Sequence, residues 1–163
     1  MYQEVVTDKR ICLVSKAHPP LKKLKLMGFM GPVSRNAWDI KIAFVGKYSE
    51  RSGTKLKTLK AWGTKLNDES MVVIGNRCPD LQFLNIGHCE DVTRDGVKEV
   101  VRKCKELRVL NVRGCPNVGI GILDWMVISR PPIALKEVFS PCGFPPPSED
   151  MRNLFLCFGC RLT

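Results

Sequence analysis

The chain has 163 residues, of which 44% are hydrophobic, and it carries a formal net charge of +10. This length is enough for one domain with its own core. No apolar run approaches the roughly 18 residues that a membrane helix needs, and residues 1–10 lack the apolar centre of a secretory signal. The sequence therefore predicts no membrane contact. Its eight cysteines favour a reducing compartment, which is the cytoplasm or the nucleus.

The positive charge is concentrated in the first part of the chain. Residues 1–60 hold 13 Lys and Arg against 4 Asp and Glu, whereas residues 61–163 hold 13 against 12. A basic half of this kind attracts an acidic protein, a phosphate-bearing ligand or nucleic acid. The more ordinary interpretation is a solvated flank without a partner, and nucleic acid is the partner that we expect least.

The first sixty residues predict irregular strand–helix units. Thr7 is the expected N-cap of a helix that ends before Pro19. A helix is expected over residues 36–48, followed by a polar loop at residues 49–55. The strands on either side of this helix contain Leu21, Leu24 and Leu26, and then Leu56, Leu59 and Ala61. Leu21 precedes its match Leu56 by 35 residues, so the first unit is longer than the later ones.

The next helix begins at a recognisable cap. Asn67 is its expected N-cap, since Asp68 and Glu69 follow in the first turn. Met71 and Ile74 are expected to face the core, and Thr64 takes the position at which the later strands have a cysteine.

Residues 78–118 contain an internal repeat with a step of 26 positions. Five apolar positions of the first copy recur in the second, as does the preceding Cys78, which recurs as Cys104. The first copy has Leu81, Leu84, Ile86, Cys89 and Val92, and the second has Leu107, Leu110, Val112, Cys115 and Val118. A fixed period in the twenties with the form L-x-x-L-x-[IV]-x-x-C is typical of leucine-rich repeats.

The last part of the chain continues the pattern more weakly. A helix with Ile120, Leu123, Met126 and Val127 is expected to end at Arg130, before two prolines. Leu135 and Val138 predict a strand closed by Cys142. Ser148 is the expected cap of a last helix, whose apolar residues are Leu154, Leu156 and Phe158.

The cysteines fit this pattern without partners. Cys78, Cys104 and Cys160 fall where helices close, and Cys89, Cys115 and Cys142 fall where strands close. A free cysteine packs as a small hydrophobic residue. The lone C-x-x-C of Cys157 and Cys160 has no second pair beside it, so we expect no metal and no other cofactor.

The repeat resembles the cysteine-containing leucine-rich repeats of the F-box protein family of ubiquitin ligases. Its turn, usually [IV]-T-D-x-G, stands here as residues 92–96 with one residue inserted. The resemblance implies an α/β fold: a leucine-rich repeat solenoid with a curved parallel sheet on the concave face and helices on the convex face. Residues 1–163 are then one domain of about five to six repeats, incomplete at both ends.

The resemblance also implies a function. It implies a protein-interaction module, the substrate-recognition repeats of a Skp–cullin–F-box ligase that acts in ubiquitin-dependent protein degradation. The repeats begin by residue 6, so no F-box is expected within this chain. The alternatives are an F-box-free repeat scaffold or regulator, and a receptor for an anionic small ligand that resembles plant hormone receptors with the same repeats.

The expected binding face is the concave side of the sheet, which carries the residues that alternate with the buried leucines. We expect its contacts from Lys23, Lys25, Lys60, Trp62, Phe83, Asn85, Asn111 and Arg113. The two asparagines are also consistent with a hydrogen bond to one another along the sheet. If the chain is a receptor for an anionic small ligand, these lysines hold the anion. No sequence motif of an enzyme is present, so a non-catalytic chain is expected.

Overall fold

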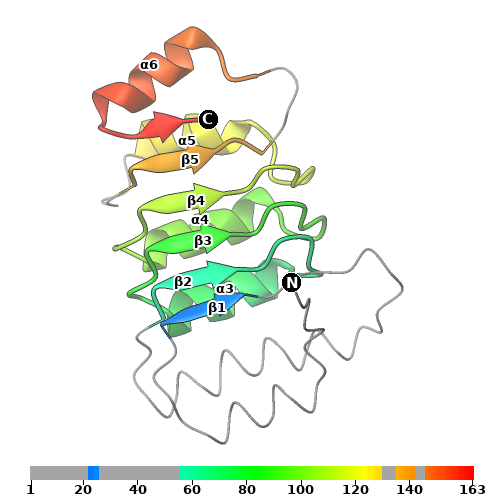
Figure 1. Cartoon of the computed structure of the whole chain (residues 1–163). Coiled ribbons are helices and arrows are strands. Elements are labelled where there is room, and N and C mark those ends of the chain that lie inside the picture. Colours follow the sequence, from blue (N-terminus) through cyan, green and yellow to red (C-terminus); the bar gives the residue numbers. More distant parts are fainter. Residues whose placement is uncertain (1–21, 26–55, 130–134, 142–145) are drawn as a thin grey trace, which may run out of the picture.

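The computed structural model describes residues 22–25, 56–129, 135–141 and 146–163 (Figure 1). Six strands form one parallel sheet in which each strand lies beside its neighbours in the chain. The strands are β1 (Lys23–Lys25), β2 (Thr58–Lys60), β3 (Phe83–Asn85), β4 (Val109–Asn111), β5 (Glu137–Phe139) and β6 (Arg161–Leu162). The α/β class and the parallel sheet predicted from the sequence are therefore confirmed.

The register of the sheet confirms the spacing read from the repeat. Leu84 pairs with Leu110, a step of 26 positions, and Leu24 pairs with Leu59, the predicted step of 35. The remaining central residues, Val138 and Leu162, continue the same row. From Leu59 onward this row is buried, since alternate residues of a strand point to the same face.

Four helices follow strands β2 to β5 in the described residues: α3 (Asp68–Arg77), α4 (Arg94–Lys103), α5 (Gly121–Ser129) and α6 (Glu149–Cys157). Helices α3, α4 and α5 lie behind the sheet in Figure 1. The caps predicted at Asn67 and Ser148 are present: the Asn67 side chain accepts a hydrogen bond from Ser70 N, and the Ser148 hydroxyl accepts one from Met151 N. Such caps satisfy amide groups that a helix leaves without partners.

The core lies between the sheet and the helices. Met71 and Ile74 are buried against the central residues of the strands, as the sequence predicted, and Val97 and Val100 are buried with them. Cys78 and Cys104 close α3 and α4, because their amide groups bond to the carbonyls of Ile74 and Val100. The remainder of this apolar cluster includes Leu81, Ile86, Cys89, Val92, Leu107, Val112, Cys115 and Val118.

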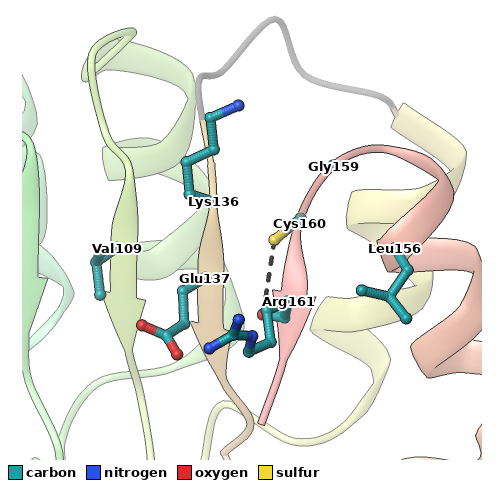
Figure 2. A pocket seen from close by; sticks show the side chains of 7 residues that line it. All are labelled: Val109, Lys136, Glu137, Leu156, Gly159, Cys160 and Arg161. Carbon is teal, nitrogen blue, oxygen red and sulfur yellow. Dashed lines mark hydrogen bonds between the residues drawn. The ribbon is translucent and has the colours of Figure 1, made fainter.

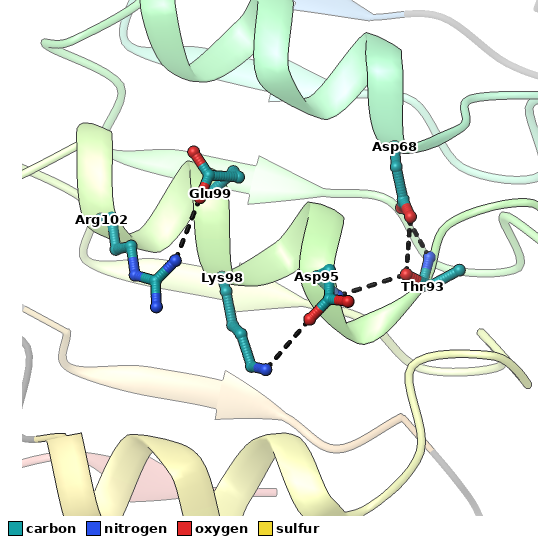
Figure 3. A network of polar contacts seen from close by, with 6 residues as sticks. All are labelled: Asp68, Thr93, Asp95, Lys98, Glu99 and Arg102. Carbon is teal, nitrogen blue, oxygen red and sulfur yellow. Dashed lines mark hydrogen bonds and ion pairs between the residues drawn. The ribbon is translucent and has the colours of Figure 1, made fainter.

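A polar contact joins the starts of α3 and α4 (Figure 3). The Asp68 carboxylate accepts hydrogen bonds from the amide and the hydroxyl of Thr93, at 2.8 and 2.6 Å. Gly96 allows this approach, because a Cβ atom at that position would collide with the Asp68 carboxylate. Thr93 in turn caps α4 by accepting from Asp95 N. One carboxylate thus fixes the spacing of two neighbouring helices.

The outer surface of α4 adds two exposed ion pairs, which link Lys98 to Asp95 and Arg102 to Glu99. The hydrogen bond from Lys98 lowers the pKa of Asp95 below its ordinary value. Pairs as exposed as these stabilise a fold only slightly, so the burial of the apolar residues dominates.

Some sequence expectations differ from the structure. Ile120 precedes α5 instead of lying in it and is exposed, while Ile122 is buried in its place. In α6, Leu154, Leu156 and Phe158 are all exposed, and the core contact comes from Phe155. The reason is that a helix turns 100° per residue, so the alternating set 154, 156 and 158 cannot share one face.

Several predicted features fall outside the described residues. They are the cap at Thr7, the helix at 36–48, the loop at 49–55, the helix end at Arg130 and the strand closure at Cys142.

Candidate functional site

The face of the sheet opposite the buried leucines carries the side chains predicted to bind a partner. Each strand presents the residues on either side of its central apolar residue, and these are half-buried or exposed. They form two rows across the sheet, given by the register. One row is Lys23, Thr58, Phe83, Val109, Glu137 and Arg161, and the other is Lys25, Lys60, Asn85, Asn111 and Phe139. Six of the eight predicted site residues lie on β1–β4, and the other two, Trp62 and Arg113, follow β2 and β4 by two positions.

Two cations on this face are held over aromatic rings. The Lys60 ammonium lies 5.2 Å from the centroid of the Phe83 ring. The guanidinium of Arg113 lies 5.6 Å from the centroid of the Phe139 ring. The negative face of a ring attracts a cation at such distances. Both charges therefore have a preferred position before any partner arrives.

The two asparagines hydrogen-bond to the main chain instead of to one another. Asn85 Oδ1 accepts from Gly87 N at 3.0 Å, and Asn111 Oδ1 accepts from Arg113 N at 3.0 Å. A backbone N–H can be satisfied only by an acceptor, so the carbonyl limb of each amide must face it. The sequence left a bond between the asparagines open as an alternative, and the described contacts do not contain it.

An aromatic pair stands just beyond the ends of β2 and β3. The rings of Trp62 and His88 meet edge to face, with centroids 5.0 Å apart. Trp62 is 39% exposed, which is large for an indole without a partner chain. Gly87 leaves room for the indole, because a Cβ atom at that position would lie 3.0 Å from Trp62 Cδ1.

His88 has an unusual backbone conformation. Its φ angle is +58°, and it is the one non-glycine residue with positive φ among those described. Gly63 and Gly114, at the corresponding positions of the neighbouring units, also have positive φ. A side chain in this region costs about 1–3 kcal/mol and is retained where the surroundings favour it. Here an imidazole replaces the glycine that the turn prefers, directly beside Trp62.

The basic edge of the face is at β1 and β2. Lys25 pairs in register with Lys60, and Lys23 lies two residues earlier on β1; all three are exposed. This arrangement places three ammonium groups on adjacent strands, as the sequence predicted.

A pocket of about 410 Å³ lies at the other end of the sheet, between β4, β5, β6 and the end of α6 (Figure 2). Val109 and Leu156 contribute apolar walls, and Lys136, Glu137 and Arg161 contribute charges. The thiol of Cys160 also lines it, and burial raises the pKa of this thiol to about 11. Burial therefore disfavours the thiolate, which is the nucleophilic form of this side chain.

None of the cysteines in the described residues forms a disulfide, and all but Cys157 are buried. Burial raises the pKa of Cys78 to about 11 and that of Cys104 to about 12. Cys104 Sγ donates to the Cys78 carbonyl, and Cys115 Sγ donates to that of Ile86. The prediction that these residues pack as small hydrophobic side chains is confirmed for the five buried ones, including Cys160.

These thiols predict a selective reaction. In a Cys12→Ser/Cys142→Ser background, native protein should show one fast thiol towards Ellman's reagent at neutral pH, from Cys157. The five buried thiols should react only as the protein unfolds, because their burial keeps the reagent away from them. Adding Cys157→Ser should remove the fast phase, and the full set should react in denaturant. A second fast thiol in native protein would contradict the packing of the repeat cysteines.

No three His, Cys, Asp or Glu side chains come together as a metal site within residues 22–25, 56–129, 135–141 and 146–163. None of the helices in the described segments combines the length and apolar character that a bilayer crossing needs. No model of a known protein family matches the sequence.

Sequence analysis missed His88 and the charges of the pocket. A signal for His88 was present, because the repeat places it level with Gly63 and Gly114, where a change from glycine is notable. Lys136 and Arg161 gave no such signal, since the pocket depends on how α6 turns back beside β6.

Proposed function

We propose that the chain is a leucine-rich repeat solenoid whose exposed sheet face is a non-catalytic protein-interaction surface. The observation that carries this proposal is the combination, on that face, of the exposed Trp62 indole with two cations fixed over rings. Aromatic and arginine side chains of this kind dominate the binding energy of protein interfaces. The similar steps of 25, 26, 28 and 24 positions between the central residues of β2 to β6 support the solenoid, because repeats that each bury their face on a neighbour produce such spacing.

We further propose that this surface recognises the substrate of a Skp–cullin–F-box type ubiquitin ligase, acting in the cytoplasm or the nucleus. Support comes from the sequence resemblance, together with the buried cysteines at the positions that the resemblance assigns to them. The experiment is affinity purification of the tagged chain from eukaryotic cells, with immunodetection of the Skp adaptor and the cullin. Recovery of both supports the ligase role. Recovery of neither, with a protein partner retained, favours an F-box-free scaffold.

The binding face itself is tested by Trp62→Ala. We expect the affinity for a retained protein partner to fall by 10-fold or more, since an exposed aromatic anchor contributes about 2 kcal/mol. The free energy of unfolding should fall by only about 1 kcal/mol, from the lost contact with His88. Ile128→Ala is the matched control, because Ile128 is 80% exposed on α5 behind the sheet. Equal binding by both variants, or unfolding of the Trp62 variant, would show that the face is wrongly assigned.

A second candidate is a receptor for a small anion at Lys23, Lys25 and Lys60. The adjacent register of these exposed ammonium groups favours it. Salt-sensitive binding of inositol hexakisphosphate, lost when the three lysines are changed to glutamate, would support this candidate over the first.

A further inference from the structure

From β1 to β4, the exposed face of the sheet carries charge of one sign. Lys23, Lys25, Lys60, Arg113 and Arg161 are cationic, and Glu137 is the one acidic side chain in the described rows. Glu137 stands on β5, so the part of the face from β1 to β4 carries cations alone. Complementary charge speeds association and rejects partners of like charge. A partner of this part of the face should therefore be acidic.

The middle of the face presents hydrogen-bond donors with a fixed direction. Asn85 and Asn111 are paired in register on adjacent strands. Each uses its Oδ1 to accept a main-chain N–H, so the Nδ2 group lies on the free limb of the amide. Neither Nδ2 group takes part in a hydrogen bond within the described residues. Two oriented amide donors thus stand between the cations of Lys60 and Arg113, and they fit a partner that offers acceptors.

The spacing of the cations selects an extended ligand. Lys60 on β2 is in register with Asn85 and Asn111, and Arg113 lies two positions beyond Asn111. Two inter-strand steps of about 4.8 Å and an offset of about 7 Å along the strand therefore separate the backbones of Lys60 and Arg113 by roughly 12 Å. Each cation is also drawn to its own ring, Phe83 on β3 and Phe139 on β5. A single phosphate is too compact to bridge them. In an extended peptide, residues three to four apart are separated by about 10–13 Å, which covers this span.

We propose, on the basis of the binding role proposed above, that this face binds an acidic, extended protein segment that runs across the strands. Carboxylates of the segment pair with Lys60 and Arg113, and its carboxylate or carbonyl oxygens accept from Asn85 and Asn111. An apolar side chain of the segment packs on Trp62. A nucleic acid fits less well, because Lys60 and Arg113 already occupy a face of the Phe83 and Phe139 rings, and Glu137 repels a phosphate backbone.

The probe is a synthetic library of peptides about ten residues long, a length that spans the strands. Glutamate is fixed at every third position and the other positions are randomised; a paired library has glutamine in place of glutamate. The dissociation constant of the best binder is then measured by fluorescence anisotropy. We expect binders from the glutamate library, and at least a 10-fold loss of affinity when their glutamates become glutamine. Affinity should also fall steeply as salt screens the charges.

The decisive variant is Asn85→Asp/Asn111→Asp. Aspartate keeps the oxygen that accepts from Gly87 N and Arg113 N, so the fold and its thermal midpoint should be retained. It removes both donors and adds repulsion, so acidic-peptide affinity should fall by 10-fold or more. Lys103→Gln/Lys105→Gln is the matched control: it changes the net charge equally, at exposed positions at the end of α4 and in the following turn. Lys60→Gln/Arg113→Gln is an independent second variant.

Several outcomes would overturn this inference. They are equal binding of the glutamine library, an equal loss in the lysine control, failure of any peptide to bind, or stronger competition by oligothymidylate or inositol hexakisphosphate than by the acidic peptide. A protein partner that is lost with Trp62→Ala but unaffected by the asparagine variant would leave the proposed function standing and remove this inference alone.

Discussion

Leu110→Ala is expected to lower the free energy of unfolding by about 3 kcal/mol, within the range of 2–5 known for buried leucines. Leu110 is the central residue of β4, completely buried, and it stands in register between Leu84 and Val138. Removing the Leu110 side chain exposes no surface to solvent, but it leaves a cavity in the row of buried strand residues against which the helices pack. Urea titration of the intact chain, followed by circular dichroism, measures the change.

Val109→Ala is the control for this prediction. Val109 precedes Leu110 on the same strand but points to the opposite face, where it is half-buried. Its truncation removes less buried surface and should cost no more than about 1 kcal/mol. Similar costs for the two variants would mean that the two faces of the sheet do not differ in packing.

The repeat allowed much of the fold to be predicted from the sequence. A step of 26 positions aligned Leu84 with Leu110, and these residues are partners in the sheet. The longer step was also visible, since Leu21 to Leu56 gives the 35 positions that separate Lys23 from Thr58. The period predicts the pairing of the strands because each strand–helix unit packs its apolar residues against the next unit, so the same sequence positions recur.

Features that occur in one strand–helix unit alone could not be predicted from the sequence repeat. Phe155 is buried and Leu156 is exposed because of the rotation of α6, which no second copy of that helix reveals. The side chains of the candidate face followed from strand alternation. The contacts of these side chains could be found only from the structure. The Asn85 and Asn111 amides turn to the main chain that follows on their own strands, and the Lys60 and Arg113 cations lie over rings of neighbouring strands.

Gly114→Ala is expected to cost about 2–4 kcal/mol, for two separate reasons. Gly114 has φ +73°, a conformation that costs a residue with a side chain about 1–3 kcal/mol. A Cβ atom there would also lie 2.7 Å from His88 Cε1 and Nδ1. The imidazole would have to leave its place beside Trp62, so the contact at 5.0 Å between the two rings would be lost as well. Denaturant titration measures the total loss in the free energy of unfolding.

Two further variants separate these contributions. Gly159 has φ +70° but no atom within 4 Å of an added Cβ, so Gly159→Ala should cost only the conformational part, about 1–2 kcal/mol. His88→Gly should itself be nearly neutral, because it relieves the positive φ of His88 while removing a ring contact of about 1 kcal/mol. In the His88→Gly background, the cost of Gly114→Ala should fall to that of Gly159→Ala. If it stays as large as in the parent chain, the imidazole does not rest against Gly114, and the aromatic pair at the end of the candidate face is held in another way.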